Sequence, residues 1–182
     1  MSQVVVVAYN PDWPKQFEAL CESIRGALCE LAARIEHVGS TAVPGLAAKP
    51  VIDIDVVVSS DDVVFAIERL TAIGYRHVGD LGIPNREVLK HRDAPVPHHL
   101  YVCPTHSEAL ANHLAVRDYL RCNTRAAHAY GELKRGLAAR YSQDMDGYVE
   151  AKSQFLLEIL RESGFDRAAL KGIEQMNRRR PP

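Results

Sequence analysis

Hydrophobic residues in the first part of the chain form short apolar runs and one clear helical repeat. Val4–Val7 is a β-branched run of the kind that forms strands. After Trp13, apolar residues recur at steps of three and four, which predicts an amphipathic helix. Arg34–Val38 predicts a short strand that ends at Gly39. Val51–Val58 is apolar on both faces except for two aspartates, a pattern typical of a central, buried strand.

The pattern changes from strands to helices near the middle of the chain. A second helical repeat ends at Gly74. Three strands are then predicted, at Tyr75–Val78, Glu87–His91 and His98–Cys103. After Pro104 the apolar spacing is helical from Ser107 to Ser163, with breaks near Asn123 and Ser142. A sheet half followed by a helical half indicates an α+β fold, with helices packed on one side of a mixed sheet.

Size and charge place the chain among ordinary globular proteins. Its 182 residues suit a single domain over 1–182, with a sheet part at about 1–104 and a helical part at about 105–182. The net charge of −1 gives no strong sign of nucleic-acid binding, and Arg178–Arg180 is interpreted as a solvated tail. There is no recognisable signal peptide, C-x-x-C pair or bilayer-length apolar run. We therefore expect a soluble, cytoplasmic protein that does not enter a membrane.

Asp53 and Asp55 are the first candidates for chemistry. They lie two residues apart on a predicted strand, so both carboxylates project from the same face. Burying two carboxylates this close is costly unless a cation or hydrogen bonds compensate. Mg²⁺ (or Mn²⁺) fits, because it is held by a few carboxylate oxygens, waters and substrate phosphates. In the structural alternative, the aspartates cap backbone groups or pair with arginines.

The segment before this strand has the features of a phosphate-binding turn. Gly39, Ser40 and Thr41 follow a predicted strand, and such a turn can direct backbone N–H groups and two hydroxyls at an anion. Lys49 adds a positive charge just before the aspartate strand. The turn and the aspartates together predict a site for a nucleotide, or another phosphorylated small molecule, with a metal.

Further cations are open to two interpretations. Lys90 and Arg92 either line the phosphate side of this cleft or belong to a solvated hairpin edge, where basic residues discourage strand pairing. In the helical half, most of the basic residues are interpreted as solvated, with one or two in reach of phosphates; they are Arg117, Arg121, Lys134 and Lys152.

Longer motifs in the chain resemble a known family. They are Tyr9–Pro14, Glu36–Leu46 (EHVGSTAVPGL), Lys49–Asp55 (KPVIDID), His98–Val102 and Arg117–Arg121. These motifs resemble the GrpB family, which is similar in turn to the nucleotidyltransferase superfamily related to DNA polymerase β. That superfamily's signature is G-[GS] followed, after about ten residues, by D-x-[DE]. The resemblance implies a nucleotidyltransferase-like mixed five-stranded sheet flanked by helices, with Asp53 and Asp55 as magnesium ligands.

The superfamily's usual third carboxylate has no evident match here. It would come from the strand at His98–Cys103, which contains no acid and presents His99 and Tyr101 on one face. His99 or His98 is a candidate base in its place, because imidazole titrates near neutral pH. Glu87, on the neighbouring predicted strand, is a possible substitute acid.

Three hypotheses for function follow. In the leading one, the chain binds a nucleoside triphosphate with Mg²⁺ at Asp53 and Asp55 and transfers a nucleotidyl group to an acceptor, with His99 as a catalytic candidate. In the second, the missing acid marks a catalytically inactive module that binds a nucleotide or another phosphometabolite. In the third, the helical half presents an amphipathic face to a protein partner, and the aspartates serve only the fold.

Overall fold

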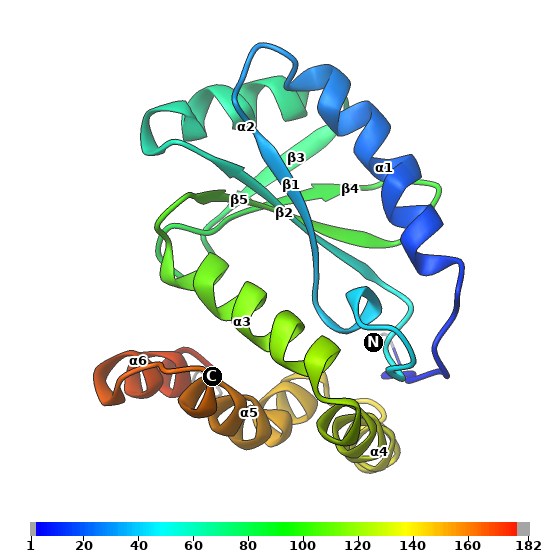
Figure 1. The fold of residues 1–182 in the computed structure, drawn as a ribbon. Helices are drawn as coiled ribbons and strands as arrows, with labels where there is room; N and C mark the ends of the chain where they lie inside the picture. The colour runs from blue at the N-terminus through cyan, green and yellow to red at the C-terminus, as the bar shows by residue number, and fades with distance from the viewer. Residues whose placement is uncertain (1–2, 178–182) are drawn as a thin grey trace.

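The computed structural model describes residues 3–177, which form a five-stranded mixed sheet with helices on both faces (Figure 1). The strands follow the order β1-β2-β5-β4-β3 across the sheet. Their bounds are Arg34–Val38 for β1, Ile52–Val58 for β2, Tyr75–Gly79 for β3, Glu87–His91 for β4 and His98–Pro104 for β5. The predicted α+β class, with a five-stranded mixed sheet and a helical C-terminal half, is confirmed.

The aspartate-bearing strand β2 lies inside the sheet, as its apolar pattern predicts. It pairs with β1 antiparallel and with β5 parallel. The parallel register places Asp53 beside His99 and Asp55 beside Tyr101. Residues in register project from the same face of a sheet, so these four side chains share one face.

The opposite face of the sheet is covered by α1 (Trp13–Ala27) and α2 (Val63–Ala72) (Figure 1). Ile24 of α1, Leu70 of α2 and Ile54 of β2 are completely buried in this core. Burying one large aliphatic side chain contributes about 1.5–3 kcal/mol. This core fixes β2 from behind, so its two carboxylates stand on a rigid strand.

The carboxylate face of the sheet meets the helical half of the chain. Its helices are α3 (Glu108–Cys122), α4 (Thr124–Arg140), α5 (Met145–Glu162) and α6 (Arg167–Asn177). Helices therefore lie on both sides of the sheet, not on one side as the order of elements suggested. The reason is an apolar patch on the carboxylate face, where Val57 and Cys103 pack against Leu110 of α3. The predicted helix breaks are confirmed, whereas α6 lies beyond the predicted helical region.

The β-branched run at Val4–Val7 does not form a strand of the sheet. In the described part of the chain it makes one isolated bridge, between Val7 and Ala48. Val4 is buried against Ala138 and Tyr148, which belong to helices. Val6 packs against the same cluster, whereas Val5 and Val7 are exposed, so only alternate residues of the run are used for packing.

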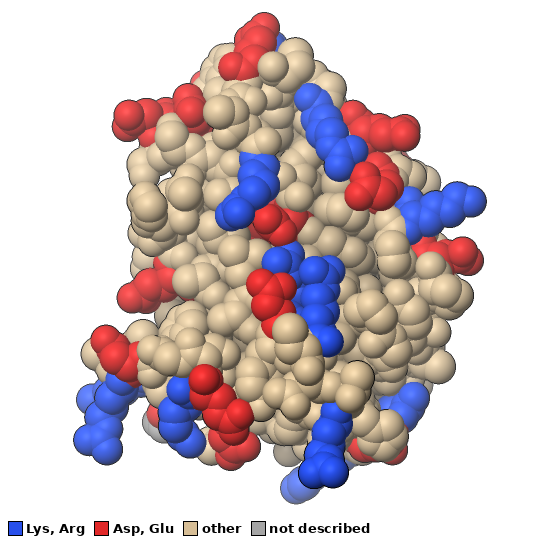
Figure 2. Space-filling model, in the orientation of Figure 1, with Lys and Arg blue, Asp and Glu red and all other residues tan. Residues whose placement is uncertain are grey.

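Charged side chains of both signs are interspersed on the face of the molecule shown in Figure 2. This distribution fits the net charge of −1. None of the helices within residues 3–177 is long and apolar enough to cross a bilayer. The arginine cluster at 178–180 lies outside the described residues.

Candidate functional site

Gly39 brings the turn after β1 into direct contact with the carboxylate of Asp53. Its backbone has φ +69° and ψ −170°, a region that is essentially restricted to glycine. A Cβ atom on Gly39 would lie 2.3 Å from Oδ2 of Asp53. The short 3-10 helix η1 (Ser40–Ala42) begins immediately afterwards. Glycine is therefore required here both by the backbone and by the close approach to the carboxylate.

Thr41, predicted to face a phosphate, is turned into the protein. Its side chain is buried, and its hydroxyl shares a 3.0 Å hydrogen bond with Nε2 of His37. His37 stacks on Phe17 with ring centroids 4.5 Å apart. Burial, reinforced by the positive charge of Arg121, lowers the pKa of His37 to about 4. This pair supports the turn from behind and does not line the cavity described below.

Lys134 of α4 holds the other hydroxyl of the turn. Its Nζ donates to Oγ of Ser40 at 2.7 Å, and the residue is only 2% exposed. The ammonium group also lies 4.5 Å from the ring centroid of Tyr130. Burial, with the nearby Lys152, lowers the pKa of Lys134 to about 7. A buried cation from the helical half is thus attached to the predicted phosphate-binding turn.

Lys49 and Lys152 complete a group of three lysines around Asp53, called the lysine cluster here (Lys49, Lys134, Lys152). Burial lowers the pKa of both Lys49 and Lys152, and the Asp53 carboxylate opposes that effect in each case. Nζ of Lys49 lies 3.4 Å from the sulfur of Met145, which is only a weak acceptor. Within residues 3–177, no lysine of the cluster forms an ion pair with a carboxylate.

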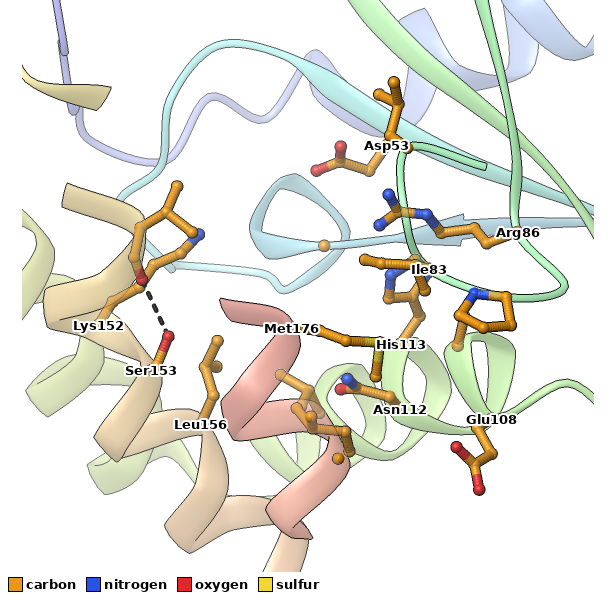
Figure 3. A pocket seen from close by; sticks show the side chains of 18 of the residues that line it. Asp53, Ile83, Arg86, Glu108, Asn112, His113, Lys152, Ser153, Leu156 and Met176 are labelled. Atoms are coloured by element: carbon orange, nitrogen blue, oxygen red, sulfur yellow. Dashed lines mark hydrogen bonds between the residues drawn. The ribbon is translucent and has the colours of Figure 1, made fainter. Parts of the chain in front are cut away.

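A cavity of about 930 Å³ lies between the carboxylate face of the sheet and the helical half. In Figure 3, Asp53 and Arg86 occupy the sheet side of the cavity, and Lys152 reaches it from α5. Gly39 and Ser40 line the same space. The helical half contributes apolar residues to the lining (Val116, Leu120, Leu156, Ile173 and Met176) as well as polar ones such as Glu108 and Asn112. The volume falls within the roughly 300–1,000 Å³ of small-molecule and cofactor sites.

His99 is hydrogen-bonded to the exposed aspartate of the pair. Nδ1 of His99 lies 2.9 Å from Oδ1 of Asp53, whose side chain is 28% exposed. An ionised carboxylate only accepts hydrogen bonds, so Nδ1 carries the proton and donates it. In the tautomer with the proton on Nδ1, Nε2 has the free lone pair.

Asp55 is closed off by a histidine from α3. Nδ1 of His113 lies 2.8 Å and 3.1 Å from the two oxygens of Asp55, and that aspartate is completely buried. A carboxylate without solvent is stable only when such a partner compensates its charge. Asp55 is therefore accessible to a cation only when the His113 hydrogen bond is broken, whereas Asp53 already borders the cavity.

Within residues 3–177, β5 carries no acid at the position of the third carboxylate. The possible substitute, Glu87, is in register with Val102 and lies 2.6 Å from Nε2 of His77, so it sits on the other face from Tyr101. Among the residues that the structure describes, no three His, Cys, Asp or Glu side chains converge as a metal site. Of the predicted pair, Asp53 is available to a cation and Asp55 only once it is released, and Glu108 of α3 is a further carboxylate that lines the cavity. Mg²⁺ accepts such a small set when substrate phosphates and waters complete it.

Lys90 and Arg92 are not among the residues that line the cavity. Lys90 is exposed on β4, where it is in register with Arg76 of β3. Arg92 is exposed in the turn that follows. Their placement resembles the solvated hairpin edge that the sequence left open as an alternative.

Two residues of the site, His113 and Arg86, were not predicted from the sequence, and Lys134 and Lys152 were named only within a group of four basic residues. The sequence did contain a signal for Lys134, because it follows Ala127 and Tyr130 and precedes Ala138 at steps of three and four residues, which places all four on one face of a helix. A lysine on such a stripe is buried together with its apolar neighbours. Lys134 is therefore one of the exceptions in a group of basic residues that were mostly interpreted as solvated.

Comparisons with known proteins agree with the motifs. The family model described as GrpB protein matches residues 3–162. Glutamate-rich protein GrpB of Alkalihalophilus pseudofirmus is 35% identical over 169 residues, which cover 88% of this chain and 95% of that protein. The chain spans less of other relatives. It covers 45% of UPF0157 protein YqkA of Bacillus subtilis, at 31% identity over 155 residues and 85% of this chain. It covers 46% of a dephospho-CoA kinase of Mycolicibacterium paratuberculosis, at 27% identity over 186 residues and 88% of this chain.

Solved structures extend the comparison to the fold. Conserved protein GrpB from Enterococcus faecalis matches with a TM-score of 0.78 at 35% identity, over 92% of this chain and 98% of that one. The Cid1 poly(U) polymerase with bound MgGTP matches with a TM-score of 0.57 at 18% identity, over 83% of this chain and 50% of that one. At this identity the second match establishes the nucleotidyltransferase fold alone.

Proposed function

The chain belongs to the GrpB family, and we propose that it binds a nucleoside triphosphate with Mg²⁺ (or Mn²⁺) and transfers its nucleotidyl group to an acceptor. The observation that carries this proposal is the lysine cluster around the Gly39–Ser40 turn. Its three cations have no carboxylate partner within the described chain. Cations held partly out of water are costly without a counter-charge, and phosphates would supply it.

The two aspartates suit a cation that is also bound to phosphates. Asp53 borders the cavity directly below the turn, so a metal at Asp53 would lie beside phosphates held by Ser40 and Lys152. Mg²⁺ in such a position neutralises phosphate charge and orients the transferred group. Asp55 would join after its hydrogen bond to His113 opens.

His99 would take the role of the missing acid. Its Nδ1–H is fixed by Asp53, which leaves Nε2 to accept the proton of an acceptor hydroxyl. The acceptor oxygen then forms a bond to the α-phosphorus while the bond to the leaving pyrophosphate breaks. The lysine cluster would stabilise the charge that gathers on that pyrophosphate.

Calorimetric titration tests the binding part of the proposal. ATP, GTP, CTP, UTP and dephospho-CoA are titrated with and without Mg²⁺ into the wild type, Lys152→Gln and an Asp53→Asn, Asp55→Asn double variant. We expect one or more nucleotides to bind the wild type in a Mg²⁺-dependent manner. Both variants should weaken that binding at least about tenfold, since a charge-assisted hydrogen bond contributes roughly 1.5–3 kcal/mol.

Lys15→Gln is the matched control, because Lys15 is exposed on α1 behind the sheet. It should bind nucleotide like the wild type. If the wild type binds none of the nucleotides, the proposal is wrong. If pyrophosphate release is unchanged in the double aspartate variant, nucleotidyl transfer at this site is wrong.

A binding module without catalysis is the second candidate, and the Asp55–His113 pair favours it. Here the second carboxylate serves the fold, as its complete burial suggests. This function predicts saturable nucleotide binding with no pyrophosphate released over long incubation. It also predicts that Asp55→Asn leaves nucleotide affinity unchanged while Asp53→Asn lowers it. Release of pyrophosphate by the wild type would remove this candidate.

A further inference from the structure

Arg86 is a cation in the cavity that has no anionic partner. Its guanidinium lies 4.9 Å from the ring centroid of Tyr101, and its Nε is buried without a hydrogen-bond partner. The adjacent Glu87 pairs with His77 and so does not neutralise it. Within residues 3–177, Arg86 forms no ion pair with any carboxylate. A buried guanidinium donor left unpaired is costly, so an external anion would complete it.

The order of strands places Arg86 across the site from the lysine cluster. The phosphate-binding turn follows β1, Asp53 stands on β2, His99 on β5, and Arg86 directly precedes β4. Figure 3 shows the Arg86 side chain entering the cavity from the side opposite Lys152, with its guanidinium directed towards Asp53. Arg86 therefore lies on the side of the proposed base, His99, and away from the proposed pyrophosphate position.

In-line transfer puts the acceptor on this side. The attacking oxygen and the leaving oxygen lie on opposite sides of the transferred phosphorus. If pyrophosphate leaves towards the lysine cluster, the acceptor must approach from the side of His99 and Arg86. Arg86 would then contact the acceptor and not the nucleotide.

The loop that carries Arg86 is held in an unusual conformation. Leu81 and Asn85 both have left-handed backbones, with φ +48° and +58°. Such residues cost of order 1–3 kcal/mol and persist where the surroundings impose them. Both line the cavity, together with Arg86. The Arg86 side chain is therefore carried by a loop of defined conformation that lines the cavity.

We propose that Arg86 binds the anionic group of the acceptor, which is then a hydroxyl-bearing small molecule with a phosphate monoester or a carboxylate. This inference rests on the proposed function. A planar guanidinium with free donors matches either anion in a bidentate manner. The cavity of about 930 Å³ leaves room for a small acceptor beside a nucleotide and favours it over a polymer.

Three small molecules with the same skeleton test this assignment: glycerol 3-phosphate, glycerate and glycerol. Each is titrated calorimetrically into protein already saturated with Mg²⁺ and α,β-methylene ATP, which occupies the lysine cluster. We expect at least one of the two anions to bind, and glycerol not to bind. Arg86→Gln should weaken anion binding about tenfold or more, Arg86→Lys should retain part of it, and nucleotide affinity should stay within twofold. Arg76→Gln, at an exposed arginine of β3, should bind both ligands like the wild type.

The other outcomes separate this inference from the proposed function. If neither anion binds the loaded wild type, or if Arg86→Gln binds them equally well, the inference is wrong. Loss of nucleotide binding in a folded Arg86→Gln variant would assign Arg86 to the nucleotide, and Arg86-dependent binding of a short single-stranded RNA would assign it to a polymer; either overturns the inference.

If no nucleotide binds the wild type, the proposed function fails, and the anions are titrated without nucleotide. Anion binding that is lost in Arg86→Gln but kept in Lys152→Gln would still support an anion site at Arg86. Binding that depends only on Lys152 would refute it.

Discussion

Replacing Gly39 by alanine tests the close approach between the turn and Asp53. The added Cβ would lie 2.3 Å from Oδ2 and 3.0 Å from Cγ of Asp53. It would also have to occupy a backbone region, φ +69° and ψ −170°, that side chains avoid. Strain of this kind costs about 1–3 kcal/mol, and overpacking adds a further 1–3 kcal/mol or so. We therefore expect Gly39→Ala to lower the free energy of unfolding by about 3–5 kcal/mol.

Urea unfolding followed by circular dichroism measures this loss. Gly45→Ala is the control, because Gly45 also has a positive φ, +78°, but open space where its Cβ would lie. Gly45→Ala should cost only about 1–2 kcal/mol. The contribution of the carboxylate follows from a double-mutant cycle with Asp53→Ala, in which Gly39→Ala should cost at least about 1 kcal/mol less than in the wild type. Equal costs in both backgrounds would refute the close approach.

Three further predictions concern buried charges. The pKa of Lys134 is lowered to about 7 in the folded protein. Between pH 7 and the ordinary lysine pKa, the Lys134 side chain is therefore protonated in the unfolded chain but has lost its proton in the folded one. As pH rises from 7 to 9, the free energy of unfolding of the wild type should therefore increase relative to that of Lys134→Met, by up to about 1.4 kcal/mol per pH unit. If the free energies of unfolding of the two proteins change with pH in parallel, this prediction is wrong. The pKa of His37 is lowered to about 4, so stability should fall as pH drops from 6.5 to 4, and His37→Gln should weaken that dependence in thermal unfolding measured across this range. His113→Ala leaves the Asp55 carboxylate buried without a partner and should cost about 3–5 kcal/mol in urea unfolding. Adding Asp55→Asn should restore part of that stability, and no recovery would contradict the pairing.

The central part of the site could be predicted from the sequence because its signals are local. Asp53 and Asp55 alternate with apolar residues, and this pattern predicts a buried central strand that carries two carboxylates on one face. The interruptions near Asn123 and Ser142 are local signals too, and both coincide with helix ends. The order of these elements was enough for the α+β class.

The residues that surround the carboxylates were harder to find, because tertiary packing places them. Lys134 meets Ser40 across 94 positions of sequence, and His113 meets Asp55 across 58. A helical period in the sequence predicts which residues share one face of a helix, but it does not predict which part of the sheet that face contacts. Arg86 lies in a loop, where the sequence has no hydrophobic periodicity from which its position could be predicted.

The charges of the site favour a ligand that is anionic at two separate points. Lys152 and Arg86 line the cavity without carboxylate partners in the described chain, and Lys49 and Lys134 interact electrostatically with Asp53, whereas each aspartate is already paired with its own histidine. Solvent can satisfy part of this excess, yet Lys134 is buried and the Nε of Arg86 has no partner. A metal alone would increase the positive charge, so the proposed Mg²⁺ would be balanced only by a ligand that also brings phosphates. One anion at the lysine cluster would leave Arg86 unpaired on the far side of Asp53. Under the proposed function a second anionic group would pair with Arg86 there, which is why the acceptor, and not a larger nucleotide, is the partner to look for first.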